Sequence, residues 1–76
     1  MAYYKDLTYL KQYDGDMFKP THKPGEHVTF SGIYRCEGCG KEISHNASVS
    51  LPPQNHHQHD YSQGDVRWKL IVWAVT

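Results

Sequence analysis

The sequence has no excess of charge of either sign. Eight Lys and Arg residues are balanced by eight Asp and Glu residues in a chain of 76. Nucleic-acid binders usually carry a basic excess, because neutralisation of phosphates dominates their affinity. We therefore expect nucleic acid not to be the partner, and single-stranded binding on an aromatic sheet face is kept only as a minor alternative.

The sequence also has no long hydrophobic run. The longest one covers residues 70–75, whereas a membrane-spanning helix needs about 20 apolar residues. The first residues lack the apolar core of a secretory signal, since Lys5 and Asp6 interrupt them. We therefore expect a cytoplasmic protein with no membrane partner.

Apolar material of any kind is scarce, because hydrophobic residues make up only 38% of the chain. A chain of this length forms one small domain with a marginal core, which we place at residues 1–76. Small scaffolds of this kind usually add a disulfide, a metal ion or a partner. The sequence therefore predicts a fold that needs a stabiliser other than its core.

The segment order predicts a mostly β protein. Residues 1–13 are expected to form an arm or short helix packed through Tyr3, Leu7 and Leu10, whose spacing is helical. Residues 14–76 are expected to form the β core. Short strands are predicted at 27–30 and 33–36, and the alternation over 43–51 predicts one half-buried strand or two short strands joined by a turn near Asn46. The expected architecture is a small antiparallel sheet or partly open barrel.

The C-terminal segment gives the strongest strand pattern. One face is expected to be apolar throughout, namely Val66, Trp68, Leu70, Val72 and Ala74. The other face begins with charged residues and ends with Ile71, Trp73 and Val75. The pattern predicts a central strand that finishes buried on both faces.

Only two cysteines are present, Cys36 and Cys39, and they lie in one Cys-x-x-Cys segment followed by Gly40. In a reducing compartment this spacing favours a metal site or a redox pair over a structural disulfide. A thioredoxin-type pair would open a helix, but here strand patterns lie on both sides of the turn. Gly40 allows a positive φ that would aim backbone amides at the sulfurs. The segment therefore predicts a metal-binding knuckle between two strands.

Structural zinc needs four ligands, so histidines or carboxylates must supply the other two. Residues 52–64 contain no aliphatic side chain but hold His56, His57 and His59. The set Cys36, Cys39, His56 and His59 has the spacing C-x2-C-x16-H-x2-H, which is close to that of known zinc sites. His57 or His45 could replace His56, although a hydrogen-bonded role is expected for His45. We expect His22 and His27 to be surface histidines.

Two segments resemble known proteins. Residues 31–43, with the Ser-Gly-Ile-Tyr-Arg-Cys-x-x-Cys-Gly knuckle, and residues 51–59, followed by Gly64 and Arg67-Trp68, are similar to small bacterial zinc-ribbon-like proteins of unknown function. The resemblance covers roughly residues 14–76. It implies a bacterial source and a ribbon-like β fold, and it implies no activity.

These patterns lead to a ranking of functions. We expect a non-enzymatic, metal-stabilised β module that binds another macromolecule, with a protein as the candidate partner. The tyrosines near the N-terminus would either supply the contact surface or pack against the sheet. Its zinc ion would be structural, since four protein ligands leave no open position. The alternative is a metal-sensing, metal-storage or thiol-redox protein that uses Cys36 and Cys39. Three ligands instead of four would favour this alternative or a hydrolytic enzyme.

Overall fold

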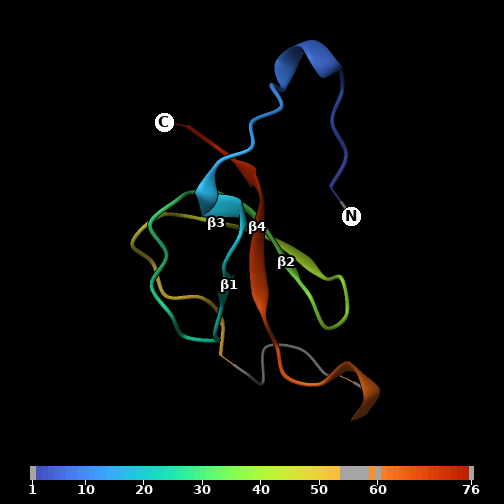
Figure 1. Cartoon of the computed structure of the whole chain (residues 1–76), viewed down its shortest axis with the longest axis vertical. Coiled ribbons are helices and arrows are strands. Elements are labelled where there is room, and N and C mark those ends of the chain that lie inside the picture. Colours follow the sequence, from blue (N-terminus) through green and yellow to red (C-terminus); the bar gives the residue numbers. More distant parts are fainter. Residues whose placement is uncertain (1, 54–58, 60, 76) are drawn as a thin grey trace.

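The protein folds into an open four-stranded antiparallel sheet. The computed structural model describes residues 2–53, 59 and 61–75. The strands are β1 (Thr21–His22), β2 (Gly32–Cys36), β3 (Glu42–His45) and β4 (Trp68–Trp73), in the order β1-β4-β2-β3 (Figure 1). Short 3-10 turns accompany them in the described part of the chain: η1 (Leu7–Tyr9), η2 (Asp16–Phe18) and η4 (Tyr61–Gln63). The predicted mostly β class, with a small antiparallel sheet, is confirmed.

The C-terminal strand occupies the centre of the sheet. β4 pairs with β1 through Thr21↔Lys69 and His22↔Trp68, and with β2 along the whole length of β2. Both neighbours run antiparallel to it. The predicted central position of this strand is confirmed, and β4 brings together the first and second halves of the chain.

A β-bulge interrupts β4 and corrects the expected assignment of its faces. Tyr34 lies opposite Leu70, but the next residue of β2, Ile33, lies opposite Val72, so Ile71 is an extra residue. Because opposed residues share a face, the side chains of β4 change sides after the bulge. Trp73 then lies on the core side, where its ring meets that of Phe30 at 5.5 Å, edge to face.

The end of β4 is therefore not buried on both faces, as the sequence pattern predicts. Ile71 is 39% exposed and Val75 is 71% exposed. The expectation was wrong because it assumed an unbroken two-residue period. The bulge moves Trp73 to the core side and leaves Ile71 on the outer face, and Val75 lies beyond the end of β4.

The chain from β3 to Leu51 is interrupted by a turn. β3 ends at His45, a turn follows at residues 47–48, and Ser50 forms an isolated bridge with His27. Of the two alternatives predicted here, the turn near Asn46 is confirmed, but only the first of the two short strands forms, since Ser50 makes an isolated bridge. The predicted strand at 27–30 is wrong, since that isolated bridge is its sole ladder pairing among the described residues.

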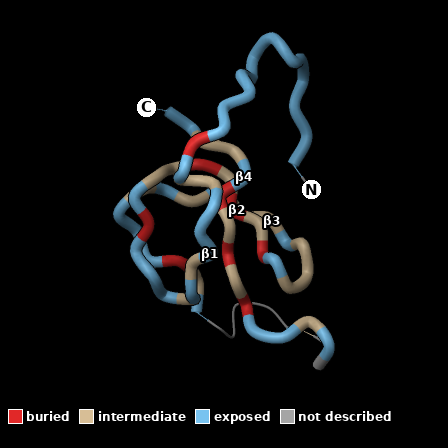
Figure 2. Tube along the Cα trace, viewed as in Figure 1, coloured by how far each residue is buried: buried red, intermediate tan, exposed pale blue. Residues whose placement is uncertain are grey.

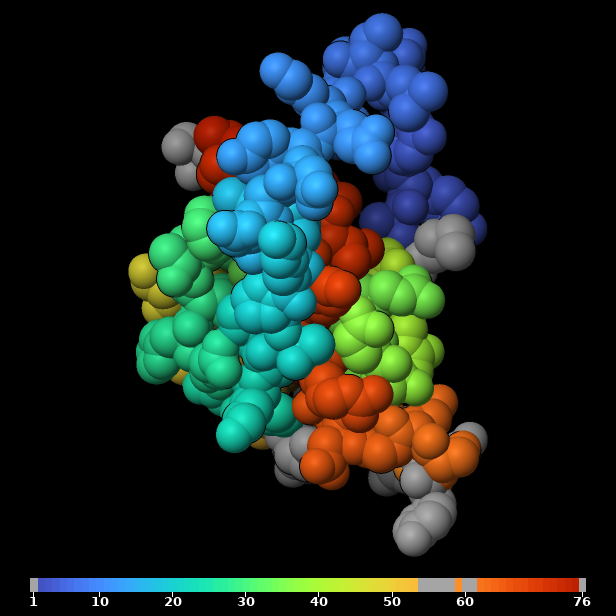
Figure 3. Space-filling view, viewed as in Figure 1, coloured from blue at the N-terminus to red at the C-terminus, as the bar shows by residue number. Residues whose placement is uncertain are grey.

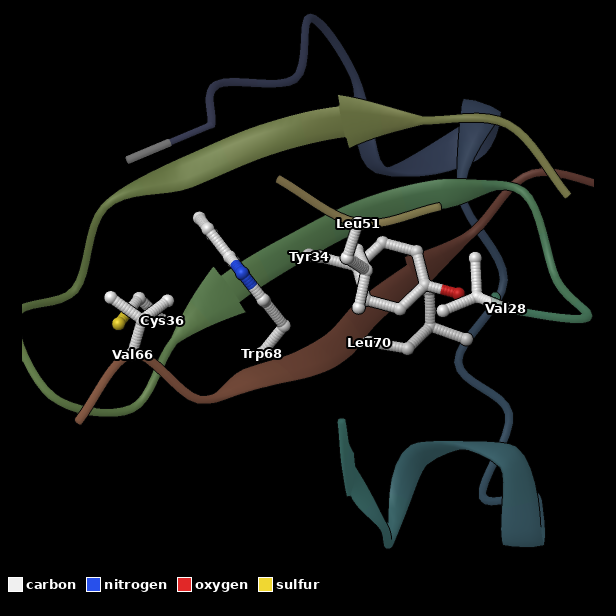
Figure 4. Close-up of a cluster of buried hydrophobic side chains, with 7 residues drawn as sticks. All are labelled: Val28, Tyr34, Cys36, Leu51, Val66, Trp68 and Leu70. Atoms are coloured by element: carbon white, nitrogen blue, oxygen red, sulfur yellow. The ribbon is translucent and has the colours of Figure 1, made fainter. Parts of the chain in front are cut away.

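The core is small and lies on one face of the sheet. Its buried side chains come from β2, β4 and the loops that cross them, and they are Val28, Tyr34, Cys36, Leu51, Val66, Trp68 and Leu70 (Figures 2 and 4). Trp68 and Cys36 are completely inaccessible to solvent. Figure 4 places Cys36 and Val66 at one end of the cluster and Val28 at the other. Cys36 of the Cys-x-x-Cys turn is thus also a core residue.

The N-terminal segment stands apart from this core. It rises from the sheet and turns back through η1, where the Asp6 side chain accepts a hydrogen bond from the Thr8 amide at 3.0 Å (Figures 1 and 3). Tyr3, Leu7 and Leu10 are 92%, 69% and 44% exposed. The expectation that these three residues pack the arm onto the protein is therefore wrong. In the described part of the chain, no helix has the length and apolar character needed to cross a membrane.

Candidate metal centre

The cysteine pair lies in a tight turn between two strands. Cys36 ends β2, residues 37–39 form the turn, and β3 begins at Glu42. The Gly40 amide donates to the Cys36 carbonyl at 2.8 Å, and the Cys36 amide donates to the Lys41 carbonyl at 2.8 Å. Gly40 has a φ of +83°, a conformation that residues with a side chain rarely adopt. The predicted knuckle and its positive φ are both confirmed.

A histidine from a distant part of the chain completes a three-residue cluster. The ligand atoms of Cys36, Cys39 and His59 all lie within 4.8 Å of one another. His59 Nε2 is 3.4 Å from Cys36 Sγ. A tetrahedral zinc ion with its usual Zn–S and Zn–N bond lengths would separate sulfur and nitrogen by about 3.5 Å. These three residues therefore lie close enough to hold a metal ion.

The imidazole of His59 is oriented by a backbone carbonyl. Its Nδ1 lies 2.7 Å from the Gly64 carbonyl oxygen. Since a carbonyl oxygen can only accept a hydrogen bond, Nδ1 carries the proton and Nε2 presents its lone pair toward Cys36. Metal-binding histidines are commonly fixed in this way by an acceptor on the second nitrogen.

Gly38 makes room for this imidazole. A Cβ atom at position 38 would lie 2.6 Å from Cε1 of His59 and 2.9 Å from the Gln63 carbonyl oxygen. A glycine inside the turn therefore lets the ring approach both sulfurs. This role of Gly38 was not predicted from the sequence, although its place between the two cysteines was a usable signal.

Replacing Gly38 with alanine is expected to weaken metal binding by about 10- to 100-fold, the usual cost of disturbing the support of a ligand. The added methyl group would displace the His59 ring or the backbone at Gln63. Competition with a metal-sensitive dye would measure the affinity. Gly25→Ala is the matched control, because no atom lies within 4 Å of a Cβ at that position. Equal affinities for the two variants would contradict this account of Gly38.

The thiol of Cys36 is held in an environment that favours its ionised form. Burial alone would raise its pKa, but hydrogen bonds from the backbone amides of Arg67, Cys39 and Gly38 and from the Cys39 side chain lower the pKa to about 7. The thiolate is the form that binds metals. The amides that converge on this sulfur therefore prepare it as a ligand.

An ion pair flanks the knuckle on its outer side. Arg35 Nη1 donates to Glu42 Oε2 at 2.7 Å, and a Cβ at Gly40 would lie 2.8 Å from Arg35 Nη2. Burial works to raise the pKa of Glu42, but the guanidinium of Arg35 holds it below its usual value. The pair clamps the first residue of β3 to β2 across the turn. Sequence reasoning missed it, since a pairing seven residues apart depends on the hairpin register.

The other histidines predicted as candidate ligands are not part of the cluster found among the described residues. His56 and His57 lie outside the described residues, so their part in the site stays a prediction. His45 is in β3, where its Nε2 lies 3.0 Å from the Val49 carbonyl oxygen and its ring meets Tyr34 edge to face. It is not part of the cluster of Cys36, Cys39 and His59, in agreement with the hydrogen-bonded role expected for it.

The two histidines near β1 are also engaged elsewhere. His22 Nδ1 pairs with the Glu26 carboxylate, which lowers the pKa of Glu26. His27 Nε2 lies 3.2 Å from the Ser50 hydroxyl. Neither belongs to the metal-ligand cluster found among the described residues.

Comparisons with known proteins give a family. No family model matches the chain, and no solved structure matches it. Protein L of Escherichia coli is 49% identical to it over 63 residues, which is 83% of this chain and 71% of that protein. Identity of this extent over most of both chains establishes common descent. The chain belongs to the same family as Protein L of Escherichia coli.

Proposed function

We propose that this protein is a small non-enzymatic module whose fold is stapled by a structural zinc ion and which binds a protein partner. The observation that carries the proposal is the convergence of Cys36, Cys39 and His59, three donors within 4.8 Å of one another. His56 remains our predicted fourth ligand. A zinc-ribbon-like knuckle with a histidine pair in place of the second cysteine pair fits this reading.

The choice of zinc follows from the donor atoms. Two thiolates with imidazole nitrogen form a soft N/S set, which suits zinc better than calcium or magnesium. A fully protein-ligated site keeps no position for a reactive water, so such an ion has a structural role.

The place of the cluster in the fold supports a stabilising role. Cys36 and His59 are 23 residues apart in sequence, and the ion would join the β2–β3 turn to the segment that leads into the central strand. The core contains few fully buried side chains. Domains of this size commonly depend on such a cross-link.

Elemental analysis of the purified protein tests the proposal. We expect one zinc per chain, and we expect a chelator to collapse the dispersion of the amide NMR spectrum, with recovery when zinc is restored. A metal-free protein with an unchanged, dispersed spectrum would overturn the structural zinc.

A redox or metal-handling role is the second candidate, and the lowered pKa of Cys36, about 7, favours it. A thiolate beside a second thiol can form a disulfide when an oxidant removes two electrons from the pair. The same sample separates the two roles. A folded, metal-free protein whose two thiols interconvert reversibly with a disulfide would replace the zinc module with this reading.

A further inference from the structure

A large groove lies between the N-terminal arm and the C-terminal end of β4. Its volume is about 1220 Å³. Its floor is formed by β4 from Lys69 onward and by Ala74 and Val75, which follow β4, and one wall is the arm from Leu7 to Asp14. Figure 3 shows the red atoms of β4 at the surface beneath the blue atoms of the arm. The groove involves none of the residues of the metal cluster.

The floor of the groove owes its character to the bulge. Ile71 is the extra residue of β4, and it lines the groove while 39% exposed. Val75, also in the lining, is 71% exposed. Bulges re-aim side chains and are frequent beside functional sites. Here the bulge places Val72, another lining residue, on the same face as Ile71, whereas an unbroken strand would have put the two on opposite faces.

The wall of the groove carries aromatic and aliphatic side chains that the fold leaves in water. Leu7, Tyr9 and Leu10 are 69%, 70% and 44% exposed, and all three line it. Tyr13 connects wall and floor, since its ring lies 5.9 Å from that of Trp73. Tyrosine, tryptophan and leucine side chains gathered around one groove are typical of protein interaction sites.

The size and charge of the groove define its occupant. Small-molecule pockets occupy about 300–1,000 Å³, so the volume fits a peptide segment better. Among the described lining residues, the charged ones are Lys11, Lys19, Lys69 and Asp14. Lys19 forms an ion pair with Asp16 at 3.0 Å, and the two other lysines of the lining then exceed Asp14 by one positive charge. We propose that this groove binds an acidic segment of a partner protein that also carries apolar side chains.

This inference rests on the proposed function as a protein-binding module and adds the surface and the chemistry of the partner. A second copy of the chain would bring the same lysines against one another, which disfavours it as the occupant. An oligonucleotide would match the lysines but would leave Ile71, Val75 and Leu10 without apolar contacts.

The test uses the 76-residue chain as purified, with the metal content that it carries. The probe is a synthetic peptide that alternates glutamate with leucine, and its counterpart has lysine at every glutamate position. We expect the acidic peptide to shift the amide resonances of Ile71, Trp73 and Leu10 and to bind more weakly as salt is added. The basic peptide is expected to shift none of them.

Two pairs of variants locate the binding. Lys11→Glu with Lys69→Glu is expected to reduce affinity about tenfold, since each reversal replaces an attraction by a repulsion. Lys5→Glu with Lys23→Glu changes the net charge equally outside the groove and should retain affinity. Ile71→Thr should weaken binding, whereas Val49→Thr, at another exposed apolar site, should not.

Several results would overturn the groove proposal. They are equal binding of both peptides, resonance shifts outside the groove, concentration-dependent self-association that Ile71→Thr abolishes, or tighter binding of an oligothymidine than of the acidic peptide. Zinc content is measured in each sample. If the parent protein retains zinc but does not bind the acidic peptide, the groove alone is refuted, whereas absence of zinc in the parent protein refutes the metal module.

Discussion

Replacing Cys39 with serine is expected to abolish zinc binding and to yield a chain without a cooperative fold. Zinc supplies about 10–16 kcal/mol of binding free energy to small zinc-dependent folds, which is as large as the whole stability of a typical domain. Cys39 is half-buried at the edge of the core, so the hydroxyl itself disturbs little packing. Near-ultraviolet circular dichroism and zinc analysis of the purified variant measure both effects.

Histidine variants provide the matched controls for this experiment. His59→Gln should reproduce the loss of zinc, because it removes the nitrogen that faces Cys36. His27→Gln should keep zinc and fold, since His27 is exposed and its ring lies beside the Ser50 hydroxyl, away from the three candidate ligands. If Cys39→Ser retains one zinc per chain and the unfolding midpoint of the parent, the ligand role of Cys39 is wrong.

Replacing Gly32 with alanine is expected to destabilise the fold by more than about 3 kcal/mol, in the range of severe backbone and packing defects. A Cβ at this buried position would lie 1.9 Å from the Val72 carbonyl oxygen and 2.9 Å from its carbonyl carbon. Both atoms are backbone of the central strand, so they cannot move aside without breaking the β2–β4 pairing. Gly32 also has a φ of +154°.

Gly25→Ala is the comparison for Gly32→Ala. Gly25 has a φ of +79°, but no atom lies within 4 Å of a Cβ there. It should therefore cost only the intrinsic strain of a left-handed alanine, about 1–2 kcal/mol. Urea unfolding of the two variants measures the difference. Equal midpoints would show that β2 and β4 do not approach as closely at Gly32 as described.

The strands that could be predicted from the sequence are those with a strong local pattern. The strand at 68–73 could be predicted because most of its side chains favour a pleated, buried environment. The turn between the strands on either side of Cys36 and Cys39 could be predicted because glycines lie on both sides of Cys39. The bulge at Ile71 was not predictable in this way. It depends on the register that β2 imposes on β4, which is a property of two distant segments.

In the candidate site too, the residues with a local sequence pattern could be predicted, and the contacts between distant segments could not. The two cysteines are ligand candidates because their spacing lets one turn present both sulfurs, and His59 follows as one of the few remaining donors. The Gly64 carbonyl that orients His59 has no sequence signature, since every residue carries a carbonyl. The space beneath the ring at Gly38 depends on the packing of residues far apart in sequence.

Cys36 is at once a ligand candidate and a fully enclosed member of the apolar cluster around Trp68. Cys39 and His59 are only half-buried, so an ion held by all three residues would be covered by the core on the side of Cys36 and accessible from the side of the other two. Exchange of isotopically labelled zinc would then need only a local opening at Cys39 and His59, and it would depend less on denaturant than global unfolding does. The bond to Cys36 would be the last to break, because the packing around Trp68 encloses its sulfur.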